Sequence, residues 1–109
     1  MKTDYEFLKT EIDGHILTVT INRPEVMNAL HPPAHAEFDE VWNEFEKDEN
    51  LWVGIVTGAG DRAFSAGNDL KFQAQAGGKM DINIASSGFA GLTSRFNLTK
   101  PLIAAVNGV

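Results

Sequence analysis

The sequence predicts an α/β fold in which strands and helices alternate within about one small domain. Three observations carry this prediction: a β-hairpin pattern near the start, an amphipathic helix pattern after it, and an apolar run typical of a buried strand. The chain has 109 residues, of which 43% are hydrophobic and 22% are charged. This size and composition are those of an ordinary globular domain.

The hairpin pattern covers the first strands. Residues 5–12 alternate roughly between apolar and polar side chains, and Asp13-Gly14 follows as a dipeptide typical of hairpin turns. Residues 15–21 are rich in β-branched side chains, which favour strands. The second strand is expected to end at Asn22-Arg23-Pro24, since proline cannot donate to a strand ladder.

An amphipathic helix is predicted next. Pro32-Pro33 stand where a helix can begin, and Asp48-Glu49-Asn50 is expected to end it. Large apolar residues recur between them at helical spacing, namely Phe38, Val41, Trp42 and Phe45. The opposite face carries Glu37, Asp39, Glu40, Glu44 and Glu46, and we expect it to be a solvated face.

The remaining elements follow from similar patterns. Residues 51–57 predict a buried strand, residues 69–75 a short helix stopped by Gly77-Gly78, and residues 102–106 another buried strand. The spacing of Phe89, Leu92 and Phe96 predicts a second long helix over about 82–97. The order strand, strand, helix can therefore repeat along the chain.

Composition excludes several classes of function. The formal net charge of −6 disfavours binding to nucleic acid or to an anionic membrane. The chain has no cysteine, so disulfides, thiolate nucleophiles and cysteine metal sites are excluded, and we expect no metal. We see no signal-peptide pattern and no apolar run of about 18 residues, so a cytoplasmic location is expected.

The stretch 58–70 allows three interpretations. Gly58 to Ala63 match the dinucleotide fingerprint G-x-G-x-x-A of a Rossmann module, although Gly67 soon interrupts the helix which that fingerprint requires. Alternatively, small residues before Asn68 leave a backbone N–H open to a ligand oxygen, as in an oxyanion hole. The third interpretation, a simple helix cap at Asn68 or Asp69, is the one that the residues alone favour.

Three segments together resemble a known family. INRPEVMNAL (21–30), WVGIVTGAGDRAFSAGNDLK (52–71) and KPLIAAVNGV (100–109) resemble, in order and spacing, the enoyl-CoA hydratase/isomerase family, or crotonase superfamily. The resemblance implies a spiral of β-β-α units, with residues 1–109 as the N-terminal part of an acyl-CoA-binding domain whose later part lies beyond this chain. It also implies an acyl-CoA thioester substrate, no cofactor other than the coenzyme A of that substrate, and a homotrimer or hexamer.

The resemblance also implies a site. The backbone N–H of Asn68 would hold the thioester oxygen, and Asp69 would cap the following helix. The implied acyl-CoA-binding residues are Glu25, Val26, Ala66, Gly67, Asn68, Asp69, Leu70 and Lys71. Asn28-Ala29-Leu30 would support this loop, and core packing is the preferred role for Phe72, Phe89 and Phe96. We expect structural or surface roles for His15, His31 and His35.

The implied reaction is hydration of an enoyl-CoA through an enolate. Isomerases, dehydratases and thioester hydrolases of the same family share this part of the sequence and remain alternatives. The family's second oxyanion donor and catalytic glutamates would fall after Val109. A different alternative is therefore that the 109-residue chain by itself is a non-catalytic fragment, inactive and prone to aggregate.

Overall fold

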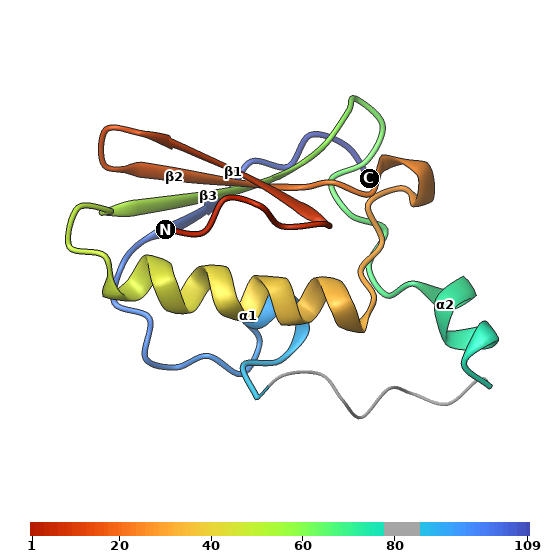
Figure 1. Ribbon diagram of the computed structural model, residues 1–109. Helices are drawn as coiled ribbons and strands as arrows, with labels where there is room; N and C mark the ends of the chain where they lie inside the picture. The colour runs from red at the N-terminus through yellow and green to blue at the C-terminus, as the bar shows by residue number, and fades with distance from the viewer. Residues whose placement is uncertain (78–85) are drawn as a thin grey trace.

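A four-stranded sheet packed on one long helix forms the body of the protein (Figure 1). The computed structural model describes residues 1–77 and 86–109. The strands β1 (Leu8–Asp13), β2 (Ile16–Ile21), β3 (Val53–Gly58) and β4 (Leu102–Ala104) lie side by side in that order. The β1–β2 pair is antiparallel and the other two pairs are parallel. The strand–strand–helix–strand order predicted from the sequence is confirmed.

Helix α1 (Pro32–Lys47) covers one face of the sheet. The side chains of its predicted apolar stripe, from Phe38 to Phe45, are fully buried, as are Leu17 and Val19 of β2. Gly54 of β3 lies beneath the helix. A Cβ atom there would lie 3.3 Å from Trp42 Cζ3 and 2.5 Å from Leu102 Cδ2, so glycine allows helix and sheet to approach closely.

The acidic face of α1 is not simply solvated, contrary to expectation. The Glu37 carboxylate accepts the N–H groups of Glu6 and Phe7 at 2.9 and 2.8 Å. Asp39 pairs with the Arg95 guanidinium at 3.1 Å. Further along, Glu44 and Glu46 accept from Lys2 and Thr99. These carboxylates therefore bind segments from both ends of the chain to the helix, because unpaired backbone N–H groups of those segments need acceptors.

The second long helix predicted from the sequence is wrong over 86–97, and its remaining part, 82–85, lies outside the described residues. The structure has only the short 3-10 helix η2 (Phe89–Gly91) there. Gly88, Ala90 and Gly91 all have positive φ, which a right-handed helix does not allow. Phe89 packs against the core from this irregular segment, whereas Phe96, expected in the core, is 92% exposed.

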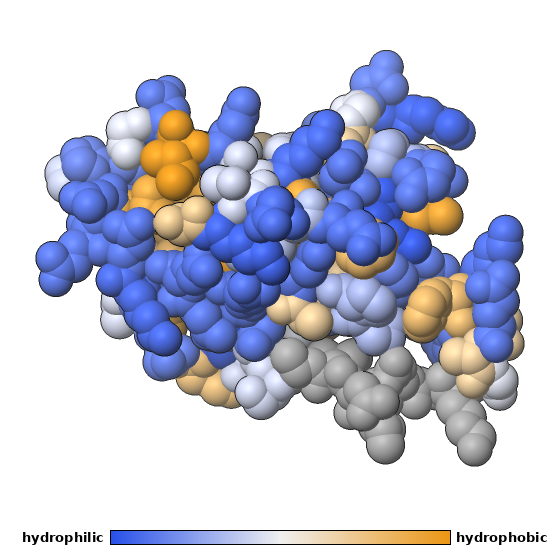
Figure 2. Space-filling view, viewed as in Figure 1, coloured by the Kyte–Doolittle hydropathy of each residue, from blue (hydrophilic) through white to orange (hydrophobic). Residues whose placement is uncertain are grey.

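The last strand differs from expectation as well. β4 ends at Ala104 instead of residue 106, and only Leu102 packs against the core. Ile103 of β4 is 51% exposed, and Val106, which follows the strand, is 65% exposed; β4 lies at an edge of the sheet. The face of the molecule in Figure 2 is largely hydrophilic with scattered apolar residues. Within residues 1–77 and 86–109, no helix has both the length and the apolar character to cross a membrane.

The sheet determines where a site can form. β2, β3 and β4 run parallel, so their carboxyl ends meet at one edge. The 3-10 helix η1 (Pro24–Val26) follows β2 there, and the loop 59–69 leads from β3 to the short helix α2 (Leu70–Gln75). Figure 1 shows both segments at the end of the sheet that is nearest α2. Ligands of open α/β sheets bind at such carboxyl ends.

The core can be tested with two phenylalanines on different segments. Phe38→Ala is expected to lower the free energy of unfolding by about 3–5 kcal/mol, because it removes a fully buried ring and leaves a cavity. Phe96→Ala is the matched control and is expected to change it by less than about 0.5 kcal/mol, since that ring is exposed. Urea unfolding of both variants measures the difference. Equal losses would contradict the core described above.

Candidate functional site

The loop after β2 is held by one buried side chain. Asn28 is fully buried, and its Oδ1 accepts the Arg23 N–H at 3.0 Å. Its Nδ2 donates to the carbonyl oxygens of Ala59 and Ala63 at 3.0 and 2.9 Å. Met27 and Asn28 both have left-handed backbone conformations, with φ of 56° and 54°. The supporting role predicted for Asn28 is thus visible: it joins the loop after β2 to the loop after β3.

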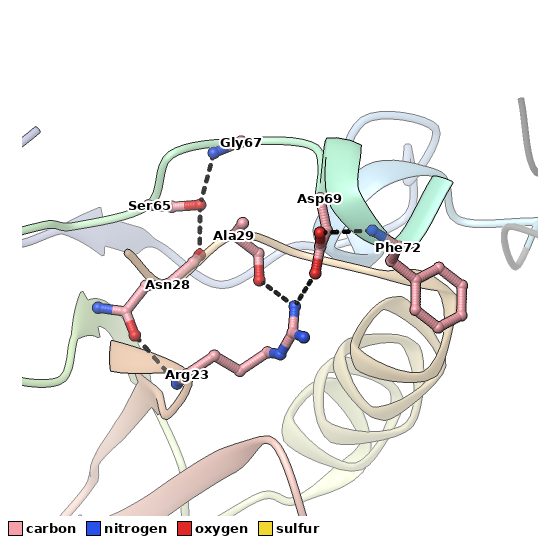
Figure 3. Close-up of polar contacts among 7 residues, drawn as sticks. All are labelled: Arg23, Asn28, Ala29, Ser65, Gly67, Asp69 and Phe72. Atoms are coloured by element: carbon pink, nitrogen blue, oxygen red, sulfur yellow. Dashed lines mark hydrogen bonds and ion pairs between the residues drawn. The ribbon is translucent and has the colours of Figure 1, made fainter. Parts of the chain in front are cut away.

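The second loop runs past this support as an extended segment. The Ser65 hydroxyl donates to the Asn28 carbonyl at 2.8 Å and accepts the Gly67 N–H at 3.1 Å (Figure 3). Leu30 N–H donates to the Gly67 carbonyl at 2.7 Å, and Asp69 N–H donates to the Leu30 carbonyl at 2.9 Å. This pattern makes a parallel bridge between Leu30 and Asn68. Residues 67–69 are therefore paired in a fixed register with Leu30, which follows η1.

The Asn68 amide stands apart from its neighbours. In a parallel bridge, the flanking residues 67 and 69 bond to Leu30, so the N–H of Asn68 itself faces the other side. The amides of Ala66, Gly67 and Asp69 all have acceptors within the protein. In the part of the chain that the structure describes, the Asn68 amide has none. It is a fixed, unpaired donor on an exposed residue.

Gly67 shapes the approach to this donor. Its φ of 88° is one that side-chain-bearing residues rarely adopt, while a Cβ at this position would meet no atom within 4 Å. The glycine is therefore required by backbone conformation rather than by space. Ala66 beside it is exposed and small. No bulky side chain of residues 66 and 67 covers the donor.

Asp69 caps helix α2, as predicted. Its Oδ1 accepts the Phe72 N–H at 2.9 Å, and its Oδ2 accepts from Arg23 Nη1 at 2.9 Å. Burial on its own raises the pKa of Asp69, but the Phe72 N–H and the Arg23 guanidinium outweigh it and hold the pKa below its usual value. This carboxylate stays charged and committed to two partners. It is poorly suited to transfer protons at neutral pH.

The position of the helix refines the expectation from the sequence. α2 begins at Leu70 with Asp69 as its N-cap, so Asn68 precedes the cap. The bridge to Leu30, not the helix start, orients the Asn68 amide. No helix begins between β3 and Leu70, where the dinucleotide fingerprint at Gly58 requires one. The Rossmann interpretation is therefore wrong.

The other residues implied by the resemblance lie on two neighbouring segments. On η1, Glu25 is exposed and Val26 is half-buried. The Ala66 N–H donates to the Met27 carbonyl, and this bond connects the end of η1 to the segment that contains Asn68. Leu70 is 72% exposed, and Lys71 is also exposed, at the start of α2. The structure thus brings these positions to one edge of the sheet around Asn68.

The sequence interpretation missed three supporting side chains, Arg23, Ser65 and Asn107. Asn107 accepts the Gly58 N–H at 3.1 Å and donates to the Gly58 and Gly60 carbonyls at 2.7 and 3.1 Å. In the sequence, Arg23 stands out only as part of the Asn22-Arg23-Pro24 break after the second strand. The sequence around Arg23 shows only a single basic residue between a buried strand and a proline. This pattern does not indicate which residue Arg23 pairs with.

His31 lies beneath the site. Its ring stands edge-on to the rings of Phe7 and Phe72, with centroid distances of 4.4 and 5.2 Å. Burial and the nearby Arg23 charge lower its pKa, and within the described residues its Nδ1 has no hydrogen-bond partner. His15 instead stacks on Trp52 at the far turn, and His35 lies buried in α1.

Comparison with known proteins identifies the family. The family model described as enoyl-CoA hydratase/isomerase matches residues 11–109. The chain belongs to the enoyl-CoA hydratase/isomerase family. This membership confirms the crotonase-type α/β fold expected from the three sequence segments.

Named members of the enoyl-CoA hydratase/isomerase family are similar over nearly the whole chain. A carnitinyl-CoA dehydratase of Escherichia coli (strain K12) is 48% identical over 103 residues, which are 94% of this chain and 39% of that protein. The structure of EchA1_1 from Mycobacterium paratuberculosis matches with a TM-score of 0.83 at 36% identity, over 96% of this chain and 40% of that one. A carnitinyl-CoA dehydratase structure from Mycobacterium avium 104 gives 0.82 at 36% identity, with 94% and 40% covered. This chain spans about two fifths of each relative's length.

The lowered pKa of His31 predicts a pH dependence of stability. A histidine with a folded pKa below its ordinary value of 6.5 binds protons more readily when unfolded. Its contribution to the free energy of unfolding is therefore full above about pH 6.5 and is lost as the pH falls toward the folded pKa. An NMR titration of the His31 ring protons should show a midpoint below 6.5. A midpoint at or above that value would show that the prediction is wrong.

Proposed function

We propose that this chain forms part of an enoyl-CoA hydratase-type enzyme, in which the Asn68 amide N–H donates to the carbonyl oxygen of an acyl-CoA thioester. One observation carries the proposal: within residues 1–77 and 86–109, the amide of Asn68, an exposed residue, has no acceptor, whereas the amides of Ala66, Gly67 and Asp69 are all paired. Family membership supports the substrate class, because named relatives are carnitinyl-CoA and enoyl-CoA enzymes.

The amide suits the chemistry of an enolate. Negative charge grows on the thioester oxygen as the enolate forms, so a donor at that oxygen binds the transition state more tightly than the substrate. The bridge to Leu30 already fixes the Asn68 amide, and no reorganisation is needed when the charge develops. Losing one such donor typically costs about 2.7–4 kcal/mol of transition-state stabilisation.

Acyl-CoA binding is proposed to follow the surface around this donor. Ala66 and Gly67 leave room for the thioester, and the exposed Leu70 offers an apolar contact. The exposed Lys71 supplies a cation for a phosphate of coenzyme A. On η1, Val26 offers a further apolar contact. Glu25 carries a negative charge, so we place it at the edge of the binding surface, away from phosphates.

Hydration or its reverse is the reaction that we favour. Adding water to a double bond and removing it from the alcohol are two directions of one reaction, and the relatives are named hydratases and dehydratases. Asp69 is committed to Arg23 and to the Phe72 N–H, so it does not serve as the acid or base. We propose that residues outside these 109 supply the proton-transfer groups and a second donor. Trimeric or hexameric assembly and a cytoplasmic location stay predictions.

The role of the Asn68 N–H can be tested by a backbone substitution. Replacing Asn68 by its α-hydroxy acid analogue turns the Gly67–Asn68 amide into an ester and removes the Asn68 N–H. It also makes the Gly67 carbonyl a weaker acceptor for the Leu30 N–H. In the protein at its natural length, this change is expected to lower kcat/KM for crotonyl-CoA by about 10²–10³-fold. Steady-state kinetics measures the effect. Calorimetric titration with an acyl-CoA should still show binding.

Asn68→Ala is the control for this experiment. It keeps the backbone N–H and removes only the side-chain carboxamide, whose Nδ2 donates to Gln73 Oε1. Its kcat/KM should stay within a few-fold of the parent value. An ester variant as active as the parent protein, or an acyl-CoA titration without heat for any chain length, would contradict the proposed function.

The 109-residue polypeptide on its own is expected to be inactive toward crotonyl-CoA, because its proton-transfer groups are proposed to lie elsewhere. Exposed apolar side chains, among them Ile103, Val106 and Phe96, also favour aggregation of this polypeptide. A hydration assay run beside the natural-length protein, together with size-exclusion chromatography, checks both points. Measurable hydration by residues 1–109 would show that a base lies within them.

A further inference from the structure

A buried ion pair includes Asp69, the residue next to the candidate donor in the chain. Arg23 Nη1 and Asp69 Oδ2 are 2.9 Å apart, and the two side chains are only 11% and 8% exposed. The same Nη1 donates to the Ala29 carbonyl at 2.6 Å. Asp69 and Ala29 are the chain neighbours of Asn68 and Leu30, the two residues of the bridge. One guanidinium therefore contacts both strands of the bridge (Figure 3).

Capping of α2 does not require this charge. An asparagine at position 69 would also accept the Phe72 N–H, since asparagine and aspartate are comparable N-cap residues. A buried pair of this kind adds little net stability in general, because burying two charges costs about as much as their attraction returns. The Arg23 Nε is moreover buried without a partner among the described residues. What the pair supplies is a fixed position for the backbone on both sides of the bridge.

We propose that Arg23 and Asp69 are positioning residues for the Asn68 amide. The proposal rests on the proposed function, in which this amide meets the thioester oxygen. Arg23 reaches the bridge from the loop after β2, and Asp69 belongs to the segment that carries the donor. Holding the Ala29 carbonyl and the Asp69 carboxylate with one nitrogen prevents the two strands from shifting along each other.

Such positioning affects the transition state more than the bound substrate. A donor displaced by about 1 Å loses up to 10²-fold in rate, because its geometry no longer matches the developing oxyanion. Asp69→Asn is therefore expected to lower kcat by about 10–100-fold, while KM changes by less than about 3-fold. A merely structural role would lower the amount of folded protein without this division between kcat and KM.

The chain offers a matched control in a second ion pair. Arg95 and Asp39 are 3.1 Å apart, with side chains 5% and 29% exposed, and they join the segment after η2 to α1 rather than to the bridge. Asp39→Asn makes the same chemical change as Asp69→Asn. It is expected to leave kcat within about 2-fold of the parent value, although it too removes a partner from a buried arginine.

Infrared spectroscopy of a bound acyl-CoA provides a readout apart from activity. The probe is butyryl-CoA, which lacks the double bond, labelled with carbon-13 at the thioester carbonyl and bound to the protein at its natural length. A donor at the carbonyl oxygen lowers its stretching frequency relative to free butyryl-CoA. This shift is expected in the parent protein and in Asp39→Asn, and it should be largely lost in Asp69→Asn.

Variants at Arg23 keep the test decisive if Asp69→Asn folds poorly. Arg23→Lys retains a cation that can reach one of the two oxygens, so it should keep part of the shift, whereas Arg23→Gln should lose it. A full shift in Asp69→Asn and Arg23→Gln would overturn the positioning role while leaving the proposed function intact. Equal loss in Asp39→Asn would also overturn it, because any buried pair would then suffice. No shift in the parent protein would instead remove the proposed function itself, and the positioning role with it.

Discussion

The buried carboxamide of Asn28 is the constraint on which the candidate site depends. It has no contact with solvent, yet it carries both donors and acceptors that must be satisfied. The Arg23 N–H and the carbonyls of Ala59 and Ala63 satisfy them, and these groups come from the loops after two different strands. Each partner left unpaired would cost about 1–3 kcal/mol. The two loops can therefore lie only where this one side chain reaches all three.

The register of the bridge follows from that constraint. Once Asn28 fixes the path of its own backbone, its carbonyl accepts the Ser65 hydroxyl, and Leu30 two residues later meets residues 67–69. The left-handed conformation of Asn28 helps to turn the chain from η1 into this bridge, and asparagine adopts it more readily than most residues. The sheet and α1 lie beside these loops, while the side-chain bonds of Asn28 and Ser65 and the backbone bonds of Leu30 together set the orientation of the Asn68 amide.

Local patterns made much of the fold predictable. The hairpin around Asp13-Gly14, the stripe of α1 and the strand β3 are each encoded within a few residues, and all three elements are confirmed. The strand β3 begins at Val53 and is mostly half-buried, however, rather than buried as predicted. The helix expected near Phe89 failed because helical spacing of apolar residues does not require a helix. Positive φ at Gly88 and Gly91 lets an irregular segment place Phe89 on the core instead.

The contacts that build the site were much less accessible to the sequence. Arg23 and Asp69 are 46 positions apart, and neither pattern nor propensity joins them. The prediction of a solvated acidic face on α1 was wrong for the same reason. The partners of these carboxylates, such as the Phe7 N–H and Arg95, lie far from them in the sequence. The donor at Asn68 was placed by resemblance to a family. The residues alone favoured a helix cap, which Asp69 indeed provides.

The nature of the donor explains this division. Every residue except proline carries a backbone N–H, so the side chain at position 68 does not reveal the group proposed to act. Among the described residues, this amide differs from its neighbours in having no acceptor, while the amides on either side of it are paired. Ser65 engages the Gly67 amide, and Leu30 engages the Asp69 amide. The information about the donor therefore resides in the groups that pair the amides around it, which are the Ser65 hydroxyl and the backbone carbonyls of Met27 and Leu30, rather than in the side chain at position 68.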